Sequence, residues 1–168
     1  MRTVKVEPLS VEGFLPFGFY ANLINPDTDK IGAAPIEFFR DMVQLDLGNT
    51  FLPSFSTCRV EKRDLVIDVS EYHNTTGEGI MPIDNDMIMH VGPATPPDPD
   101  AGIPLDEIRV FHVPKGTFVA LRRGVWHHGP FTINEKPVNH LIVLPARTYA
   151  VDCNVVHFPD EDRIYIEA

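Results

Sequence analysis

Cysteine, basic residues and long apolar runs are all scarce in this sequence. The two cysteines, Cys58 and Cys153, form neither a metal-type pair nor a disulfide framework, so both are expected to be buried thiols. Fourteen basic residues against 24 acidic ones give a formal net charge of -10, which argues against nucleic acid and anionic membranes as partners. No stretch approaches the ~20 apolar residues of a membrane span, and the start lacks the apolar core of an export signal. We therefore expect a cytoplasmic protein.

The length and the spacing of turn residues indicate the fold class. The 168 residues suffice for one domain with a real core, so residues 1–168 are expected to form a single domain. Sixteen prolines and 11 glycines divide the chain into short pieces, which favours strands over helices. A short helix is expected where Ser10 can cap a turn that runs to Phe14. Alternating apolar residues predict strands over 38–45, 64–69, 86–91, 107–113, 117–121, 139–144 and 163–166.

This pattern predicts an all-β sandwich or small β-barrel with one or two short helices. Between Thr95 and Pro104, proline removes so many backbone donors that no strand can pair there. That segment is predicted to be a long hairpin connection on the surface, and the alternative is an active-site lid.

A first candidate site segment ends the strand that begins near Ile67. Alternation places Ile67, Val69, Glu71 and His73 on one face, so an aliphatic row becomes ionisable near its end, as at the mouth of a barrel. Glu-x-His followed by Glu78 resembles the first metal-binding motif of the cupins, with Glu71 in place of the first histidine. Glu71, His73 and Glu78 are therefore candidate ligands for a divalent transition metal. The alternative is a strand whose last residues emerge into solvent.

A second candidate segment runs from Val113 to Pro130. Its Pro-x-Gly, short strand and Gly-Val-Trp-His-His resemble the second cupin motif, but the histidine expected soon after Pro-x-Gly is absent. Adjacent His127 and His128 point to opposite sides of an extended chain, so only one of them can face a cavity. Trp126 is expected to anchor the core or the pocket rim.

Five segments together resemble the ureidoglycolate lyases, a family of cupins, over nearly the whole chain. They are, in order, Val6 to Ser10 with Phe14 and Gly18, Glu71-x-His73 leading to Met81-Pro82-Ile83, Leu105 to Phe111, Val125 to His128, and Asp152 to Val155. The resemblance implies a cupin jelly roll, commonly a homodimer, that cleaves ureidoglycolate to glyoxylate and urea. Two positions depart from the family pattern: Arg122 stands where a histidine is usual, and Glu78 where glutamine is usual.

This elimination needs a base for the hydroxyl proton and an acid for the departing nitrogen, and it does not strictly require a metal. His73 is the candidate base, with Glu71 or Glu78 orienting its ring. Whichever of His127 and His128 faces inward is the candidate acid.

The candidate substrate-binding residues are Arg122, Arg123, Glu78 and Trp126. Either arginine could hold the substrate carboxylate through two parallel hydrogen bonds, or both could simply pair with surface acids. Two other functions stay open: a metal-dependent cupin isomerase or oxygenase that uses Glu71, His73 and Glu78, and a cupin that binds a small molecule without turning it over.

Overall fold

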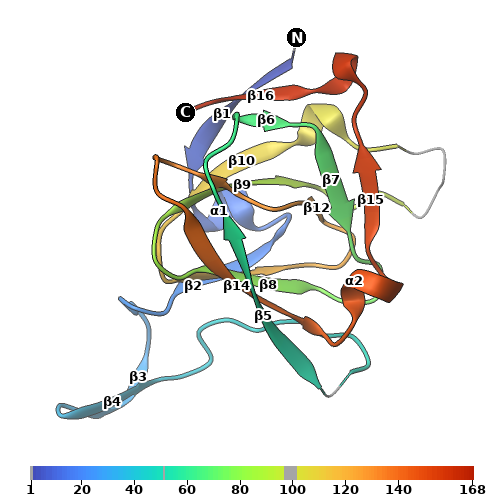
Figure 1. Ribbon diagram of the computed structural model, residues 1–168. Helices are drawn as coiled ribbons and strands as arrows, with labels where there is room; N and C mark the ends of the chain where they lie inside the picture. Colours follow the sequence, from blue (N-terminus) through green and yellow to red (C-terminus); the bar gives the residue numbers. More distant parts are fainter. Residues whose placement is uncertain (1, 51, 97–101) are drawn as a thin grey trace.

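The computed structural model describes residues 2–50, 52–96 and 102–168, and these form two curled β-sheets that face each other across a core (Figure 1). The larger sheet has the order β15 (Asn154–His157), β7 (Val69–Tyr72), β12 (Trp126–His127), β9 (Met87–Gly92), β10 (Arg109–Val113), β1 (Arg2–Pro8), β16 (Ile164–Glu167), β6 (Val66–Ile67). Strand β13 (Phe131–Thr132) also pairs with β9.

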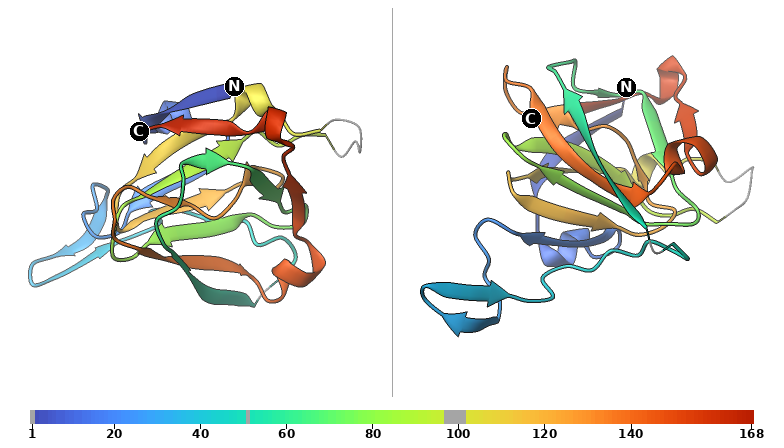
Figure 2. Two further views of the ribbon diagram at one scale, coloured as in Figure 1. Left: turned by 45° about the horizontal axis from the view of Figure 1, so that its top comes forward. Right: turned by 60° about the horizontal axis from the view of Figure 1, so that its bottom comes forward.

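The second sheet has the order β2 (Gly18–Asn22), β11 (Thr117–Leu121), β8 (Glu78–Pro82), β14 (Val138–Pro145), β5 (Pro53–Val60). The remaining pair, β3 (Lys30–Ala33) and β4 (Ile36–Phe39), forms a hairpin that projects from the body in every view (Figures 1 and 2). The strands pair antiparallel except where β1 runs parallel to β10 and β16. The expected all-β jelly roll is confirmed.

The helices are short. Helix α1 (Val11–Phe14) begins after Ser10, whose hydroxyl accepts a hydrogen bond from the backbone amide of Gly13 at 3.1 Å. This confirms the predicted cap. Helix α2 (Thr148–Val151) and single 3-10 turns at Leu105–Glu107 and Asp160–Asp162 complete the described elements. No helix in the described ranges is long and apolar enough to cross a membrane.

The core has two parts because the central strands are buried on both faces. Along β9, Met87, Met89 and Val91 belong to the cluster between the sheets, whereas Ile88 belongs to a second cluster on the other side of the strand. Period-two alternation thus sends apolar side chains into two separate clusters. The face that carries Val91 also carries the ionisable residues discussed below.

Some predicted strands differ from the observed ones. The strand predicted over 38–45 is wrong beyond Phe39, because Asp41 adopts a left-handed φ of 51° and residues 40–50 carry no strand. The strand predicted over 64–69 is split into β6 and β7 at Asp68. Residues 97–101 of the predicted proline-rich loop lie outside the described residues, and 95–96 and 102–104 carry no strand.

Candidate functional site

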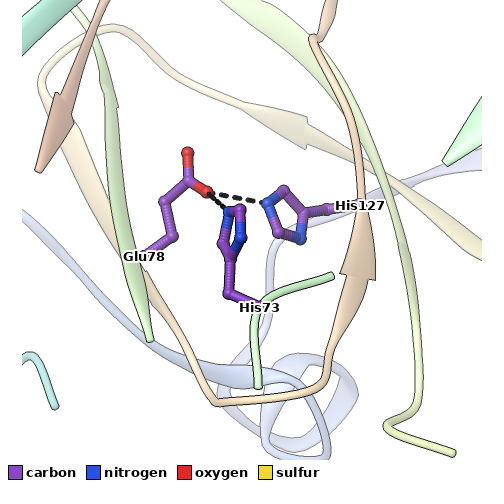
Figure 3. A group of neighbouring side chains, drawn as sticks. All are labelled: His73, Glu78 and His127. Atoms are coloured by element: carbon purple, nitrogen blue, oxygen red, sulfur yellow. Dashed lines mark hydrogen bonds and ion pairs between the residues drawn. The ribbon is translucent and has the colours of Figure 1, made fainter. Parts of the chain in front are cut away.

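Three ionisable side chains from the two candidate segments meet inside the barrel (Figure 3). His73 follows β7, Glu78 opens β8 and His127 ends β12. Oε2 of Glu78 lies 2.9 Å from Nε2 of His73 and 2.8 Å from Nε2 of His127. Each of the three residues is at most 6 % exposed. The ionisable row near residue 70 and the Trp-His-His segment therefore line the same interior.

Backbone carbonyls determine which nitrogen of each ring faces Glu78. Nδ1 of His73 is 2.6 Å from the carbonyl oxygen of Asp152, and Nδ1 of His127 is 2.8 Å from that of Val125. A carbonyl oxygen can only accept, so Nδ1 of each ring carries a hydrogen and donates it. Nε2 of each ring is then the atom that is free to exchange a proton or bind a cation.

The pair of Glu78 and His127 is charged at neutral pH. Burial raises the pKa of the Glu78 carboxyl, but His127 and His73 lower it further, and the net pKa is about 2. Burial lowers the pKa of His127, but the charge and hydrogen bond of Glu78 and the carbonyl of Val125 raise it to about 9. Glu78 is therefore ionised and the His127 ring protonated.

The three converging atoms also match the donor set of a transition-metal site. Their ligand atoms all lie within 4.8 Å of one another. Two imidazole nitrogens and one carboxylate suit zinc, nickel or iron, and the Nδ1 hydrogen bonds to carbonyls are the outer contacts that orient metal-binding histidines. An ionised Oε2 is stabilised next to two Nε2 atoms only when each Nε2 carries a proton or when a cation lies between them. The geometry fits either state.

A buried serine of β7 and a buried histidine of β9, the two neighbours of β12 in the sheet, hold the backbone of β12 in place. The hydroxyl of Ser70 donates to the backbone carbonyl of His127 at 3.1 Å and lies 3.1 Å from Nε2 of His90. Burial holds the pKa of His90 well below its usual value, so this ring is neutral. The contact fixes the backbone from which His127 projects.

Glu71 lies beside the trio but is bound elsewhere. It is the register partner of His127 across β7 and β12, and its Oε2 accepts a hydrogen bond from Sγ of Cys153 at 2.8 Å. Burial and this contact raise the pKa of the Cys153 thiol to about 12. The third member of the cluster with His73 and Glu78 is His127, whereas the sequence-based metal set has Glu71 in that place.

The other two residues of the Trp-His-His run do not face the trio. His128 is partly buried, and its Nδ1 has no hydrogen-bond partner among the described residues. Trp126 points away from the side of β12 that carries His127, packs edge-on against Tyr72 with ring centroids 4.4 Å apart, and donates to Thr95. Trp126 and Tyr72 line a separate surface groove of about 770 Å³.

Both candidate arginines are engaged at the surface. The Arg122 guanidinium lies 4.7 Å from the centre of the Phe19 ring and donates to the carbonyl of Leu15. Arg123 makes two hydrogen bonds to the carboxylate of Asp46, at 2.7 and 2.8 Å. Neither makes a hydrogen bond to His73, Glu78 or His127 within the described ranges.

Sequence reasoning missed the groups that orient the trio. The carbonyl of Val125 and the pair of Ser70 and His90 have no signal in the sequence, because backbone contacts and buried polar pairs depend on the register between strands. Asp152 could have been found from the sequence, because it is the first residue of the last segment that resembles the family.

Comparisons with known proteins agree with the resemblance. The sequence model of the family described as "Ureidoglycolate lyase" matches residues 1–165. A "Ureidoglycolate lyase" of Pseudomonas aeruginosa (strain LESB58) is 24% identical over 172 residues, which cover 99% of this chain and 97% of that protein. Another, from Rhodobacter capsulatus, is 27% identical over 129 residues, covering 76% of this chain and 77% of that protein.

A solved structure shares the fold. The dTDP sugar isomerase from Desulfovibrio desulfuricans G20 superposes with a TM-score of 0.51 at 12% sequence identity, and the match covers 87% of each chain. This likeness supports the jelly roll.

Proposed function

The chain belongs to the ureidoglycolate lyase family, and from this membership we propose that it cleaves ureidoglycolate, or a closely related small ureido- or hydroxy-carboxylate, to glyoxylate and urea. The proposal rests on one observation: the buried side chains of His73 and His127, from two distant segments, both contact the carboxylate of Glu78. An acid and a base held on one carboxylate are the groups that this cleavage needs.

The reaction transfers two protons and breaks one carbon–nitrogen bond. In ureidoglycolate a single carbon carries a hydroxyl, a ureido nitrogen and the carboxylate. Loss of the hydroxyl proton lets its electron pair form the aldehyde C=O of glyoxylate, while the C–N pair leaves with the ureido nitrogen. That nitrogen takes up a proton to give urea. Atoms and electrons balance without an oxidant or a reductant.

We assign the two proton transfers to the two rings of the trio. His73 keeps its hydrogen on Nδ1, toward the carbonyl of Asp152, and accepts the hydroxyl proton at Nε2 once the substrate hydroxyl has replaced Glu78 as the partner of that nitrogen. His127, whose pKa of about 9 keeps its ring protonated, gives the proton at Nε2 to the departing nitrogen. Glu78 stays ionised and holds the ring of His127, while the carbonyl of Asp152 holds the ring of His73. Each transfer contributes ~100- to 10,000-fold to the rate.

The charges of Glu78 and His127 balance each other before the substrate enters. Glu78 is ionised and the ring of His127 is protonated, so this pair is neutral overall. The carboxylate of the substrate therefore needs a further cationic or hydrogen-bonding partner. Direct binding of the same carboxylate by Arg123 would require this arginine to leave Asp46, and Arg122 would have to leave the ring of Phe19.

The trio is equally suited to hold a divalent transition metal through Nε2 of His73, Nε2 of His127 and the carboxylate of Glu78. A bound metal supplies a Lewis acid that polarises an oxygen of the substrate. The same two nitrogens cannot hold a metal and carry the transferred protons. This convergence also favours a second candidate function, a metal-dependent cupin isomerase or oxygenase.

Incubation with ureidoglycolate tests the proposal. Purified protein, prepared without chelator and again after chelator treatment, is given ureidoglycolate, and glyoxylate and urea are measured. We expect release above the spontaneous rate in both preparations. A stoichiometric metal whose removal abolishes release would contradict the acid-base assignment, and binding without release would identify a sensor instead of an enzyme.

A further inference from the structure

The projecting hairpin has one wholly apolar face. In the register of β3 and β4, Ile31 lies opposite Phe38 and Ala33 opposite Ile36, so alternation places all four on one face. The other face carries an ion pair between Lys30 and Glu37. Ile31, Ile36 and Phe38 are 54 to 79 % exposed. An isolated two-stranded ribbon is at best marginally stable in water, so this amphipathic hairpin needs a surface to cover its apolar face.

The whole chain exposes more surface than a compact monomer of its mass. The chain has a solvent-accessible surface of 9768 Å², about 1,400 Å² more than the roughly 8,300 Å² of a compact monomer of 18.9 kDa. A stable interface covers about 800 Å² on each partner. The excess is therefore large enough for one such contact on each chain.

A matching apolar groove lies at the root of the hairpin. It has a volume of about 340 Å³ and is lined by α1, β2 and the segment after β4, through Val11, Leu15, Gly18, Phe19, Tyr20, Asp41, Met42, Val43 and Gln44. Val11 and Phe19 are at least half exposed. The groove wall begins two residues after the hairpin ends, and the hairpin points away from the body (Figure 2). The hairpin of a chain would therefore have to fold back sharply to reach the groove of the same chain.

We propose that the apolar face of the β3–β4 hairpin docks in this groove of a second copy of the chain, and that the second copy returns the same contact. Because hairpin and groove are on one chain, a two-fold axis forms both contacts at once and closes the dimer. The contact leaves the interior trio untouched, so its test is independent of the lyase reaction.

Sedimentation measures the association over about 1 to 100 µM protein, because dissociation depends on protomer concentration. We expect the unaltered protein to have twice the 18.9 kDa of one chain. Ile36→Lys on the hairpin and Val11→Glu in the groove each place a charge in the contact and should weaken dimerisation at least about tenfold. Val151→Lys is the matched control, since Val151 and Ile36 are both 79 % exposed. It should stay dimeric.

Mixing the two weakened variants identifies the contact. In the mixed dimer one hairpin and groove are both unaltered, and the other contact brings together the opposite charges introduced by Ile36→Lys and Val11→Glu. We therefore expect the mixture to dimerise more tightly than either variant alone. A monomeric parent, a dimer insensitive to Ile36→Lys or to Val11→Glu, or a mixture no tighter than its components would overturn the proposal.

Discussion

At the scale of single residues, the two adjacent histidines have different environments. His127 shares the carboxylate of Glu78 with His73, whereas His128 makes no contact with that carboxylate among the described hydrogen bonds. His127→Gln should therefore lower kcat/KM for ureidoglycolate ~100- to 10,000-fold, because the departing nitrogen loses its proton donor. The comparison is with His128→Gln, measured in the same assay. An equal loss in both variants would show that position 127 has no special role.

The charge of His127 should depend on Glu78. With no metal at Nε2, the ring of His127 has a pKa of about 9, so it is protonated at neutral pH and loses its proton as the pH rises through 9. Glu78→Gln removes the carboxylate that raises this pKa but leaves the burial that lowers it, so the pKa should fall below 6.5, the ordinary histidine value. NMR titration of the imidazole resonances measures both values. An unchanged pKa in the variant would contradict the ion pair.

The sequence predicted part of this site and left part of it open. His73 and Glu78 follow from the alternation after Ile67 and from the resemblance to a cupin motif. The choice between His127 and His128 depends on the direction of β12, which is set by its pairing with β7 and β9 across the sheet. The partner strands lie 30 or more positions away in the chain, so the two adjacent histidines do not by themselves determine which of them faces inward.

At the scale of elements, strand β2 packs against β11 without room for a side chain at Gly18. A Cβ at this position would overlap the carbonyl oxygen of Ala120, which belongs to the paired backbone. Gly18→Ala should therefore destabilise the protein by at least about 2 kcal/mol, through forced separation of the two strands. At Gly129 a Cβ meets no heavy atom within 4 Å, so Gly129→Ala should change stability by less than about 0.5 kcal/mol. Urea unfolding of both variants checks the difference, and equal stabilities would contradict the packing.

Asp152 ties the loop after β7 to the segment before β15. Its carboxylate accepts hydrogen bonds from the backbone amides of Asn74 and Thr75 and from the hydroxyl of Thr75, at 2.6 to 2.9 Å. Loss of these bonds in Asp152→Ala should cost about 1.5–3 kcal/mol in urea unfolding at pH 7. Asp160→Ala removes an exposed carboxylate paired with Arg163 and should cost less than about 1 kcal/mol.

The effect of Asp152 should depend on pH in a definite direction. Burial raises the pKa of its carboxyl, but the bonds from Thr75 and Asn74 lower it below the ordinary 3.8. A folded-state pKa below the unfolded one stabilises the protein above pH 3.8, and this stabilisation is lost as the pH falls through the folded value. The stability difference between the parent and Asp152→Ala should therefore shrink below pH 3.8. A difference that is constant with pH would argue against an ionised Asp152.

Most elements followed from alternation and turn residues, and the exceptions have physical causes. The predicted strands at 86–91, 117–121 and 139–144 correspond closely to β9, β11 and β14. The run at 38–45 alternates in sequence, but only its first residues find a partner, in β3. Alternation shows which residues can form a strand, and pairing with another strand decides which of them do.

At the scale of the whole molecule, the fold brings together segments that are far apart in the chain. Glu78 and His127 are separated by 49 positions, yet their side chains share a hydrogen bond, because β8 and β12 lie in the two facing sheets. The resemblance to cupin motifs and to the ureidoglycolate lyases made Glu78 and one of His127 and His128 candidate site residues, whereas composition and periodicity alone predicted only a β-barrel or sandwich. The projecting hairpin was not predicted, since its exposure depends on which surfaces the rest of the chain leaves free.

Glyoxylate release by the chelator-treated protein tests the central assignment most directly. The unaltered chain and His73→Gln are each given ureidoglycolate, and glyoxylate is followed beside a protein-free blank. We predict that the unaltered chain releases glyoxylate and urea in equal amounts well above the blank, and that His73→Gln, which stays folded by circular dichroism, is slower by ~100-fold or more. Release by the unaltered chain no faster than the blank, or an unchanged rate in His73→Gln, would contradict the assignment.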